Sequence, residues 1–299
     1  GFCLLCSAHR RKVGGKIPIG VQVIALGGGK YEGIVHGGGL PGAGWDGITR
    51  YYIRGEWKRG RGEAPRFVGV HGERLKFENH NFRGTVVVLP AGDGGPGAKV
   101  LPLALFQGTA AMFLNQVDDP RFSLERVVRK SLTLGASSPK DARVLFDGSN
   151  VEEWVDGKIV EGPQMLLAAG TRSRRKFKDY RLHLEFRTPF MPTARGMQRG
   201  NSGVYLQDTW EIQVVDSFGW TTENRKYERL SHVGRCGGLH EMITPRVNMC
   251  LPPLSWQTYD IEHTAARVAA AGERARPAVL SVRHNGVLIH DRVILPPVP

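Results

Sequence analysis

The chain has 299 residues, a length that predicts two domains, each large enough to bury its own core. Its 41 Lys and Arg residues outnumber 28 Asp and Glu residues, which gives a net charge of +13. No stretch approaches the ~18 apolar residues of a membrane helix, so no transmembrane segment is predicted. The basic residues come without a helix-turn-helix, zinc-finger or RNA-recognition motif, so we expect no specific nucleic-acid partner. The excess charge fits an anionic polymer at a basic surface, an anionic envelope surface, or solubility.

Short apolar runs separated by Gly, Pro and Asn turn signals predict an all-β protein. Residues 1–18 are expected to form a flexible tail. Cys3 and Cys6 form a Cys-x-x-Cys pair within it, but no second pair of ligands follows at a spacing that suits a metal. The apolar start indicates the remainder of an export or membrane segment, or a truncated start.

Residues 19–130 are predicted to form a smaller N-terminal β domain. Val21–Leu26 and Tyr31–His36 should pair as a hairpin across the Gly-rich residues 27–30. Further strands are expected at Lys76–His80, Thr85–Leu89 and Val100–Leu105, and Phe122–Lys130 fits either a helix or a strand. Residues 131–143 are expected to be a linker, and residues 144–299 the second domain.

Residues 199–216 predict a β-hairpin with one apolar and one polar face. Strand alternation places Val204, Leu206, Ile212 and Val214 on the apolar face. The polar face carries Asn201, Tyr205, Gln207, Glu211 and Gln213. A loop of odd length keeps both faces uniform, so we expect a loop of residues 208–210 that pairs Gln207 with Glu211 and Tyr205 with Gln213. Amides, a phenol and a carboxylate on one sheet surface suit sugar hydroxyls, although a solvated outer face is the alternative.

The hairpin is part of a longer series of motifs in the second half of the chain. In chain order they are Leu145-Phe-Asp-Gly148 with Trp154, Arg199-Gly-Asn-Ser-Gly-Val-Tyr-Leu206, Trp210-Glu-Ile-Gln-Val-Val-Asp-Ser-Phe218, Cys236-Gly-Gly-Leu-His240, Pro245-Arg-Val-Asn248, Trp256-Gln-Thr-Tyr-Asp-Ile261 and His284-Asn-Gly-Val-Leu288. From about Val144 to Pro296 the chain therefore resembles the 3-keto-disaccharide hydrolase domain family. It departs from the family at His240, where Tyr is usual, and at Ser255, where Glu or Gln is common. The N-terminal part resembles the module that precedes this domain in secreted planctomycete-type proteins.

The resemblance implies a concanavalin-like jelly-roll sandwich whose concave sheet holds a saccharide oxidised to a ketone at carbon 3. The ketone makes the hydrogen on carbon 2 acidic, so a base can remove it and the glycosidic oxygen can leave by elimination. Water then adds, which gives net hydrolysis. Such a site needs a base near carbon 2, a donor or cation for the enolate oxygen, and an acid for the leaving group.

The residues expected to perform this chemistry are Glu211, His240 and Arg199. Glu211 is predicted to be the base or a metal ligand, His240 an acid or base, and Arg199 the clamp for the enolate or a hydroxyl. Asp216 joins them only if a bulge or turn redirects it. The predicted substrate-binding residues are Asn201, Tyr205, Gln207, Gln213, Asp216 and Arg246.

Several alternatives remain open from the sequence. A lectin-like binding module without catalysis, or a structural cell-envelope protein, could use the same fold. Glu211 could form an ion pair with Arg199 or Arg246, or join Asp216 and His240 in a metal site. A divalent cation is therefore an open prediction, because the spacing is not diagnostic.

Cys236 and Cys250 flank a 13-residue segment inside the resembling region. We expect a disulfide between them, worth about 3 kcal/mol by loop closure, with two buried thiols as the alternative. A disulfide would agree with a secreted, periplasmic or cell-envelope protein.

Overall fold

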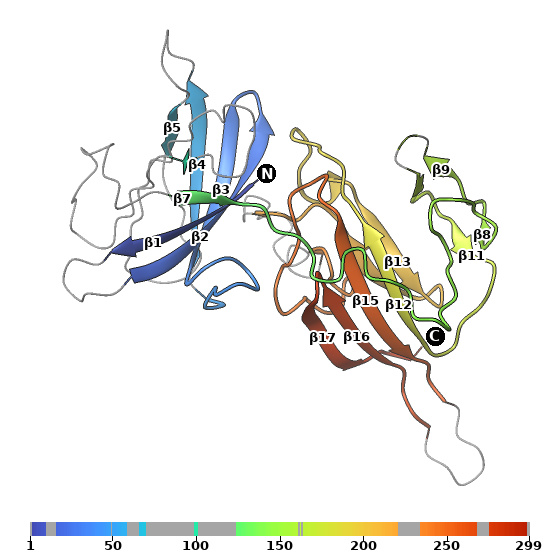
Figure 1. Ribbon diagram of the computed structural model, residues 1–299. Coiled ribbons are helices and arrows are strands. Elements are labelled where there is room, and N and C mark those ends of the chain that lie inside the picture. The colour runs from blue at the N-terminus through green and yellow to red at the C-terminus, as the bar shows by residue number, and fades with distance from the viewer. Residues whose placement is uncertain are drawn as a thin grey trace.

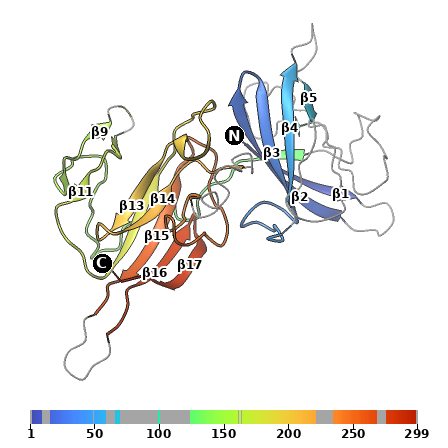
Figure 2. The same cartoon turned by 180° about the vertical axis from the view of Figure 1, so that it is seen from behind.

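A computed structural model of the chain describes residues 2–9, 16–48, 50–58, 66–69, 99–100, 124–160, 162, 164–220, 234–267 and 275–297. These residues form antiparallel β-sheets in two regions, an N-terminal sheet and a C-terminal sandwich (Figures 1 and 2). The one helical element among these residues is a short 3-10 turn, η2 (Gly196–Gln198). The prediction of an all-β chain with a sandwich of the jelly-roll type is confirmed. No helix in the described ranges is long and apolar enough to cross a membrane.

The N-terminal sheet has the strand order β5-β4-β3-β2-β1-β7-β6. Its strands are β1 (Phe2–His9), β2 (Lys16–Gly27), β3 (Lys30–Gly37), β4 (Arg50–Lys58), β5 (Arg66–Gly69), β6 (Lys99–Val100) and β7 (Leu124–Val127). The predicted hairpin of β2 and β3 is confirmed, and Gly27 and Gly28 take the left-handed conformation that its turn requires. Of the run Phe122–Lys130, the part Leu124–Val127 is a strand rather than a helix.

The start of the chain differs from the flexible tail that the sequence predicted. Phe2–His9 forms strand β1, which pairs with β2 on one side and with β7 on the other. Strand β2 also begins at Lys16, before the predicted boundary. Pairing explains the difference, because β1 satisfies backbone groups along β2 that an edge strand would leave open. The predicted strands Lys76–His80 and Thr85–Leu89 lie outside the described residues, as does Val100–Leu105 beyond its first residue.

The C-terminal region contains a four-stranded sheet, a hairpin and two short strand pairs. The sheet has the order β12 (Tyr180–Phe186), β15 (Gln257–Thr264), β16 (Val279–His284) and β17 (Val287–Ile294). The hairpin consists of β13 (Ser202–Leu206) and β14 (Trp210–Val214). The short pairs are β8 (Trp154–Val155) with β11 (Arg172–Ser173), and β9 (Ile159–Val160) with β10 (Met165–Leu166). The turn between β16 and β17 uses Asn285 and Gly286, both in the left-handed conformation that an Asn-Gly turn favours.

One hydrophobic core lies between the hairpin and the four-stranded sheet. Its fully buried members include Ile212 from the hairpin and Ile261, Leu280 and Ile289 from the sheet. Burying a side chain of this size contributes roughly 1.5–3 kcal/mol relative to leaving it exposed. A polar bond also crosses the core, because the Tyr259 hydroxyl of β15 donates to the backbone carbonyl of Gln213 at 2.7 Å. The core therefore holds the hairpin in a defined position over the sheet.

Strand β2 of the N-terminal sheet contacts the sandwich. Ile24 belongs to the same buried cluster as the sandwich core, and Arg195 Nη2 donates to the Leu26 carbonyl at 3.0 Å. A Cβ added at Gly219 would lie 2.9 Å from Ile24 Cγ2, so the two regions pack closely there. Strand β2 therefore packs against the sandwich.

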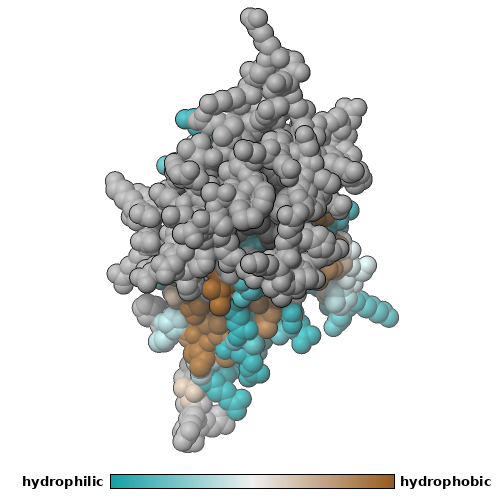
Figure 3. All heavy atoms as spheres, turned by 90° about the vertical axis from the view of Figure 1, so that its left-hand side faces the viewer, coloured by the Kyte–Doolittle hydropathy of each residue, from teal (hydrophilic) through white to brown (hydrophobic). Residues whose placement is uncertain are grey.

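Several large apolar side chains stay on the surface of the sandwich, among them Leu132 at 83% and Ile294 at 66% exposure. From the side of the N-terminal sheet, the visible part of the sandwich shows hydrophobic and hydrophilic residues next to one another (Figure 3). Single exposed apolar residues are normal on soluble proteins, so they do not mark a site by themselves.

The buried His284 predicts a loss of stability in acid. Burial lowers the pKa of His284 to about 3, and also lowers the pKa of His263 and His290. As pH falls, histidines in the unfolded chain become protonated near the ordinary pKa of 6.5, whereas His284 in the folded protein does so only near 3. The folded state is therefore fully stabilised by this group above pH 6.5 and loses that stabilisation as pH falls toward 3. Urea unfolding between pH 7 and 4 should show this, and His284→Gln should reduce the slope by up to about 1.4 kcal/mol per pH unit. Parallel pH dependences for wild type and variant would contradict the assignment.

Candidate functional site

The β13–β14 hairpin has the predicted odd loop but a different register. The loop is Gln207–Thr209, so Tyr205 lies opposite Glu211 and Gly203 opposite Gln213. The predicted pairs, Gln207 with Glu211 and Tyr205 with Gln213, are therefore wrong. The observed register brings Trp210 into the strand opposite Leu206, where Trp210 is only 3% exposed. Burial of this large aromatic ring explains the shift.

The segment after residue 235 adds to the outer edge of β14. Leu239 forms an antiparallel bridge with Ile212, and the His240 amide donates to the Glu211 carbonyl at 2.9 Å. The Gln213 amide donates to the Gly238 carbonyl at 2.8 Å in the same ladder. Antiparallel pairing therefore places His240 beside Glu211, on the side away from Tyr205.

Tyr205, Glu211 and His240 form a row across these three chain segments, which we call the polar row. The Tyr205 hydroxyl donates to Glu211 Oε2 at 2.9 Å, and this bond raises the pKa of the phenol. Gly203 leaves the space for the carboxylate, because a Cβ there would lie 2.1 Å from Glu211 Oε1. The Tyr205 side chain is 60% exposed, so the row is open to solvent at this end. Glu211 is thus held in place by a donor, with one carboxylate oxygen over the glycine.

Asn201 and Gln213 adjoin the polar row, one step along the hairpin. The Gln213 side chain is buried and donates from Nε2 to Asn201 Oδ1 at 2.6 Å and to the Ser202 carbonyl at 3.0 Å. Its Oε1 has no hydrogen-bond partner among the described residues, and neither has His240 Nδ1, although both atoms are buried. Arg199 Nη1 and His284 Nδ1 are also buried without a partner among the described residues, so an unpartnered buried atom does not by itself mark a ligand site here.

Arg199 and Asp216 form a buried ion pair at the open end of the hairpin. Arg199 Nη2 contacts Asp216 Oδ2, and the side chains are 4% and 0% exposed. Burial raises the pKa of Asp216, while the charge and the hydrogen bond of Arg199 oppose the shift. Strand alternation predicted that Asp216 points away from the polar face. Asp216 lies beyond the end of β14 at Val214, so its side chain is free to pair with Arg199 instead. Arg199 does not pair with Glu211, and its guanidinium is enclosed rather than exposed.

Two further predicted residues lie apart from Glu211. Gln207 is in the hairpin turn, where its Nε2 donates to the Phe177 carbonyl at 3.3 Å. Arg246 is 3.6 Å from Asp291 of β17, so its nearest carboxylate belongs to the other sheet. The structure therefore brings together Tyr205, Glu211 and His240 with Asn201 and Gln213, and leaves Gln207 and Arg246 outside this group.

Cys236 and Cys250 are free thiols, so the predicted disulfide is not formed, and the alternative of buried thiols describes the structure. The two thiols lie close enough to shift each other's pKa, and each also has other partners. Cys236 Sγ is 3.1 Å from the Tyr259 hydroxyl, and Cys250 Sγ donates to the Leu251 carbonyl at 3.4 Å. Burial raises the pKa of Cys250 well above its usual value, which keeps this thiol protonated. The pair gives no support for an oxidising compartment.

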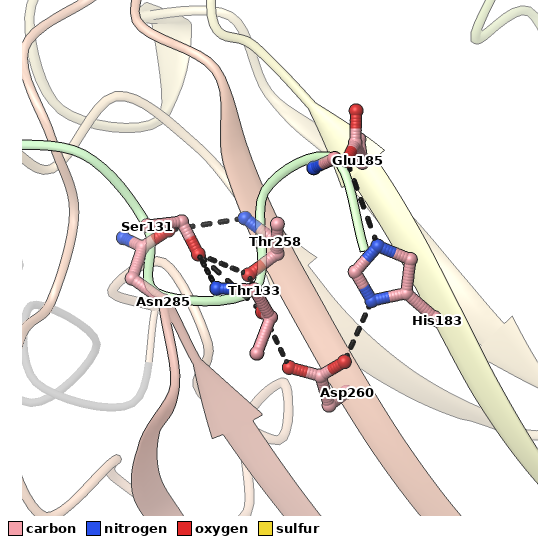
Figure 4. A network of polar contacts seen from close by, with 8 residues as sticks. Ser131, Thr133, His183, Glu185, Thr258, Asp260 and Asn285 are labelled. Atoms are coloured by element: carbon pink, nitrogen blue, oxygen red, sulfur yellow. Dashed lines mark hydrogen bonds and ion pairs between the residues drawn. The ribbon is translucent and has the colours of Figure 1, made fainter. Parts of the chain in front are cut away.

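A second polar cluster, which the sequence did not predict, lies on the outward face of the four-stranded sheet (Figure 4). His183 Nδ1 is 2.6 Å from Asp260 Oδ1, and its Nε2 is 3.6 Å from Glu185 Oε1. The Thr133 hydroxyl donates to Asp260 Oδ2 at 2.8 Å, and the Gly135 amide donates to Glu185 Oε1 at 2.6 Å. The sequence signal that could have indicated this cluster is the alternation of polar residues along β12 and β15, which places His183, Glu185 and Asp260 on one face of the sheet. The cluster fastens residues 131–135 to the sheet, so its groups already have structural partners.

A metal site is not apparent in the part of the chain that the structure describes. No group of three or more His, Cys, Asp or Glu side chains there is arranged to hold an ion. Glu211 and His240 lie in the polar row, whereas Asp216 is turned into its ion pair with Arg199. The divalent cation that the sequence left open therefore stays a prediction.

Comparisons with known proteins add a family to this geometry. The family model described as 3-keto-alpha-glucoside-1,2-lyase-like domain matches residues 141–298. The crystal structure of a candidate glycosyl hydrolase from Parabacteroides distasonis is 27% identical, over 53% of this chain and 67% of that chain, with a TM-score of 0.45. The search of curated proteins found no match.

The ion pair predicts strong destabilisation when either partner is removed alone. Arg199→Met leaves a buried carboxylate unpaired, so we expect a loss of about 3–5 kcal/mol in the free energy of unfolding. The double variant Arg199→Met/Asp216→Leu should lose less, because no charge stays buried. Urea unfolding measures both, with Arg181→Met in the exposed pair with Glu262 as the control that should change little. A mild single variant would contradict this account of the pair.

Proposed function

Because the chain belongs to the family of 3-keto-alpha-glucoside-1,2-lyase-like domains, we propose that it cleaves glycosides oxidised to a ketone at carbon 3. The substrate class is 3-keto-glycosides or 3-keto-disaccharides. The reaction is removal of the carbon 2 proton, elimination of the glycosidic oxygen and addition of water. Residues 144–299 would carry this activity, joined through residues 131–143 to an N-terminal β domain whose sheet begins at Phe2 rather than at residue 19.

The observation that supports the proposal is the polar row. Glu211 is a partly buried carboxylate with a fixed donor in Tyr205 and an imidazole as its cross-strand neighbour in His240. An acid–base pair of this kind suits proton abstraction followed by protonation of a leaving group. An exposed, solvated sheet face would not need the glycine beneath Glu211.

We assign the steps as follows. The Glu211 carboxylate takes the proton from carbon 2, and the electron pair forms an enolate whose oxygen is on carbon 3. The Tyr205 hydroxyl donates to Glu211 before the reaction. Once the carboxylate has taken the proton, the hydroxyl can turn and donate to the enolate oxygen instead. Collapse of the enolate expels the glycosidic oxygen, which His240 protonates. Glu211 then loses the abstracted proton to solvent, water adds to carbon 1, and carbon 2 takes up a proton from solvent, so the net change is hydrolysis.

This assignment moves one role relative to the sequence prediction. Arg199 was expected to clamp the enolate, but its guanidinium is enclosed by the ion pair with Asp216. We therefore propose that Arg199 supports the hairpin and that Tyr205 takes the donor role. Asn201 is exposed and would orient a sugar hydroxyl, while the buried Gln213 would hold Asn201 in position by donating from Nε2 to its Oδ1.

A lectin-like function without catalysis is the second candidate. The specific observation in its favour is the Tyr205 ring, which at 60% exposure could stack on a sugar face. Binding without cleavage of any keto sugar would support this function.

For the location of the protein we propose secretion, the periplasm or the cell envelope. The support is the sequence resemblance to secreted proteins, since the free thiols add none.

Replacing the proposed base should strongly reduce turnover and leave the fold intact. With 3-keto-trehalose and an aryl 3-keto-glucoside, Glu211→Gln should reduce kcat by roughly 10²–10⁴-fold, the contribution typical of a general base. The unoxidised parent sugars should not be cleaved by either protein, and a parallel assay with a chelator tests the divalent cation. Glu262→Gln on the other sheet is the matched control and should be fully active.

A second variant tests the space beneath the carboxylate. Gly203→Ala would place a Cβ against Glu211 Oε1, so the carboxylate must move. We expect a clear fall in kcat although Glu211 itself is intact. Full activity of both Glu211→Gln and Gly203→Ala would remove the polar row from the reaction.

A further inference from the structure

Five of the seven residues from Arg172 to Lys178 are cationic, and all five are exposed. They are Arg172, Arg174, Arg175, Lys176 and Lys178, which we call the basic segment. The segment begins in β11 and ends two residues before β12 (Tyr180–Phe186). It belongs to the C-terminal sandwich, where β11 and β8 lie apart from the N-terminal sheet (Figure 1).

The neighbouring carboxylates do not neutralise the basic segment. Glu153 is 2.5 Å from Arg143 Nη2, and Asp179 forms an ion pair with Arg267. Glu152 contributes its backbone carbonyl, not its carboxylate, to Arg174 Nε at 3.0 Å. Arg175 and Lys178 lie near enough to lower the pKa of Glu153 and Asp179, but none of the five cations forms an ion pair with another described residue. Their charges are therefore available to an external anion.

The backbone of the segment is held in place while the cationic side chains face solvent. Arg172 pairs with Val155 in the β8–β11 ladder, and the Arg174 amide donates to the Glu153 carbonyl at 2.8 Å. The Ser173 hydroxyl donates to the Arg175 carbonyl at 2.8 Å. A fixed backbone lowers the entropy cost of binding, since fewer groups must be ordered when a ligand arrives.

We propose that the basic segment binds an anionic polysaccharide, one that carries carboxylate or sulfate groups along the chain. The guanidinium groups match such anions, because their planar fork can form two parallel hydrogen bonds to one carboxylate or sulfate. The segment lies beside the hairpin that carries the polar row, since the Phe177 carbonyl accepts from Gln207 Nε2. Binding there does not depend on the proposed cleavage activity.

The only aromatic residue of the segment argues against the other polyanions. Phe177 is partly buried and packs edge-on against Tyr180, with ring centroids 6.2 Å apart. It therefore gives no exposed platform on which nucleic-acid bases could stack. No exposed large apolar side chain lies between Arg172 and Lys178, so nothing in this segment would insert into a membrane interface. The basic segment can therefore bind a ligand only through charge and hydrogen bonds, and an acidic polysaccharide can form both.

The test is calorimetric binding of the full chain to polygalacturonate, with neutral dextran beside it. Wild type should bind polygalacturonate with an affinity that falls as salt rises, and should bind dextran weakly or not at all there. The variant Arg175→Gln/Lys176→Gln/Lys178→Gln should lose about tenfold or more in affinity. Far-UV circular dichroism checks that the variant is folded.

A matched control removes the same charge elsewhere on the surface. Lys130→Gln/Lys140→Gln/Arg292→Gln changes three exposed cations outside the segment and should bind like wild type. An equal loss in both triple variants would mean a general charge effect and would overturn the proposal. Equal or tighter binding of a DNA duplex, or of vesicles containing phosphatidylglycerol, at the same salt would assign the segment to another partner. Absence of polygalacturonate binding at low salt would also overturn it.

Discussion

The register of the β13–β14 hairpin is the constraint on which the proposed site depends. With Tyr205 opposite Glu211, one face of the hairpin supplies Ile212 and Leu206 to the core while the other face carries the polar row. A shift by one residue would exchange the faces and expose the core residues. Burial of Trp210 opposes such a shift, because its large ring fills the core at the end of the hairpin. The same hydrophobic burial that folds the sandwich thereby aligns Glu211 with its neighbours.

Polar contacts then fix the hairpin from its other sides. The ion pair of Arg199 with Asp216 closes the open end, and the Tyr259 hydroxyl ties the Gln213 carbonyl to the four-stranded sheet. The segment that ends at His240 extends the sheet beyond β14. These bonds are largely buried, so their loss would leave unsatisfied groups inside the protein. A rigid support of this kind is what a site for proton transfer requires, because small displacements of a catalytic group cost much of its effect.

Strand alternation was enough to predict the two faces of the hairpin and the odd loop, since both follow from a period of two. The exact register was not predictable in this way. Loops of residues 207–209 and 208–210 keep the faces equally uniform, and only the burial of Trp210 separates them. The position of His240 next to Glu211 depends on a pairing between segments far apart in sequence, and the family motifs placed both residues without showing their contact.

Other parts of the prediction failed for identifiable reasons. The ion pair of Arg199 was not foreseen, because strand parity directs Asp216 to the opposite face until the chain leaves the strand. The spacing of Cys236 and Cys250 does bring the two thiols close together, but both are free and each also bonds to the Tyr259 hydroxyl or to a backbone carbonyl, which the spacing does not show. The apolar residues of β1 were read as a tail because no local signal shows that a strand has partners on both sides.

The central claim is that cleavage begins with removal of the proton on carbon 2. The most direct measurement is NMR of the product formed from an aryl 3-keto-glucoside in D₂O at early times, with a sample lacking protein as the reference for spontaneous exchange. The account predicts one deuterium at carbon 2 of every product sugar that the protein releases. Release of the aryl group with the original hydrogen still on carbon 2 would contradict it and would indicate direct displacement at carbon 1.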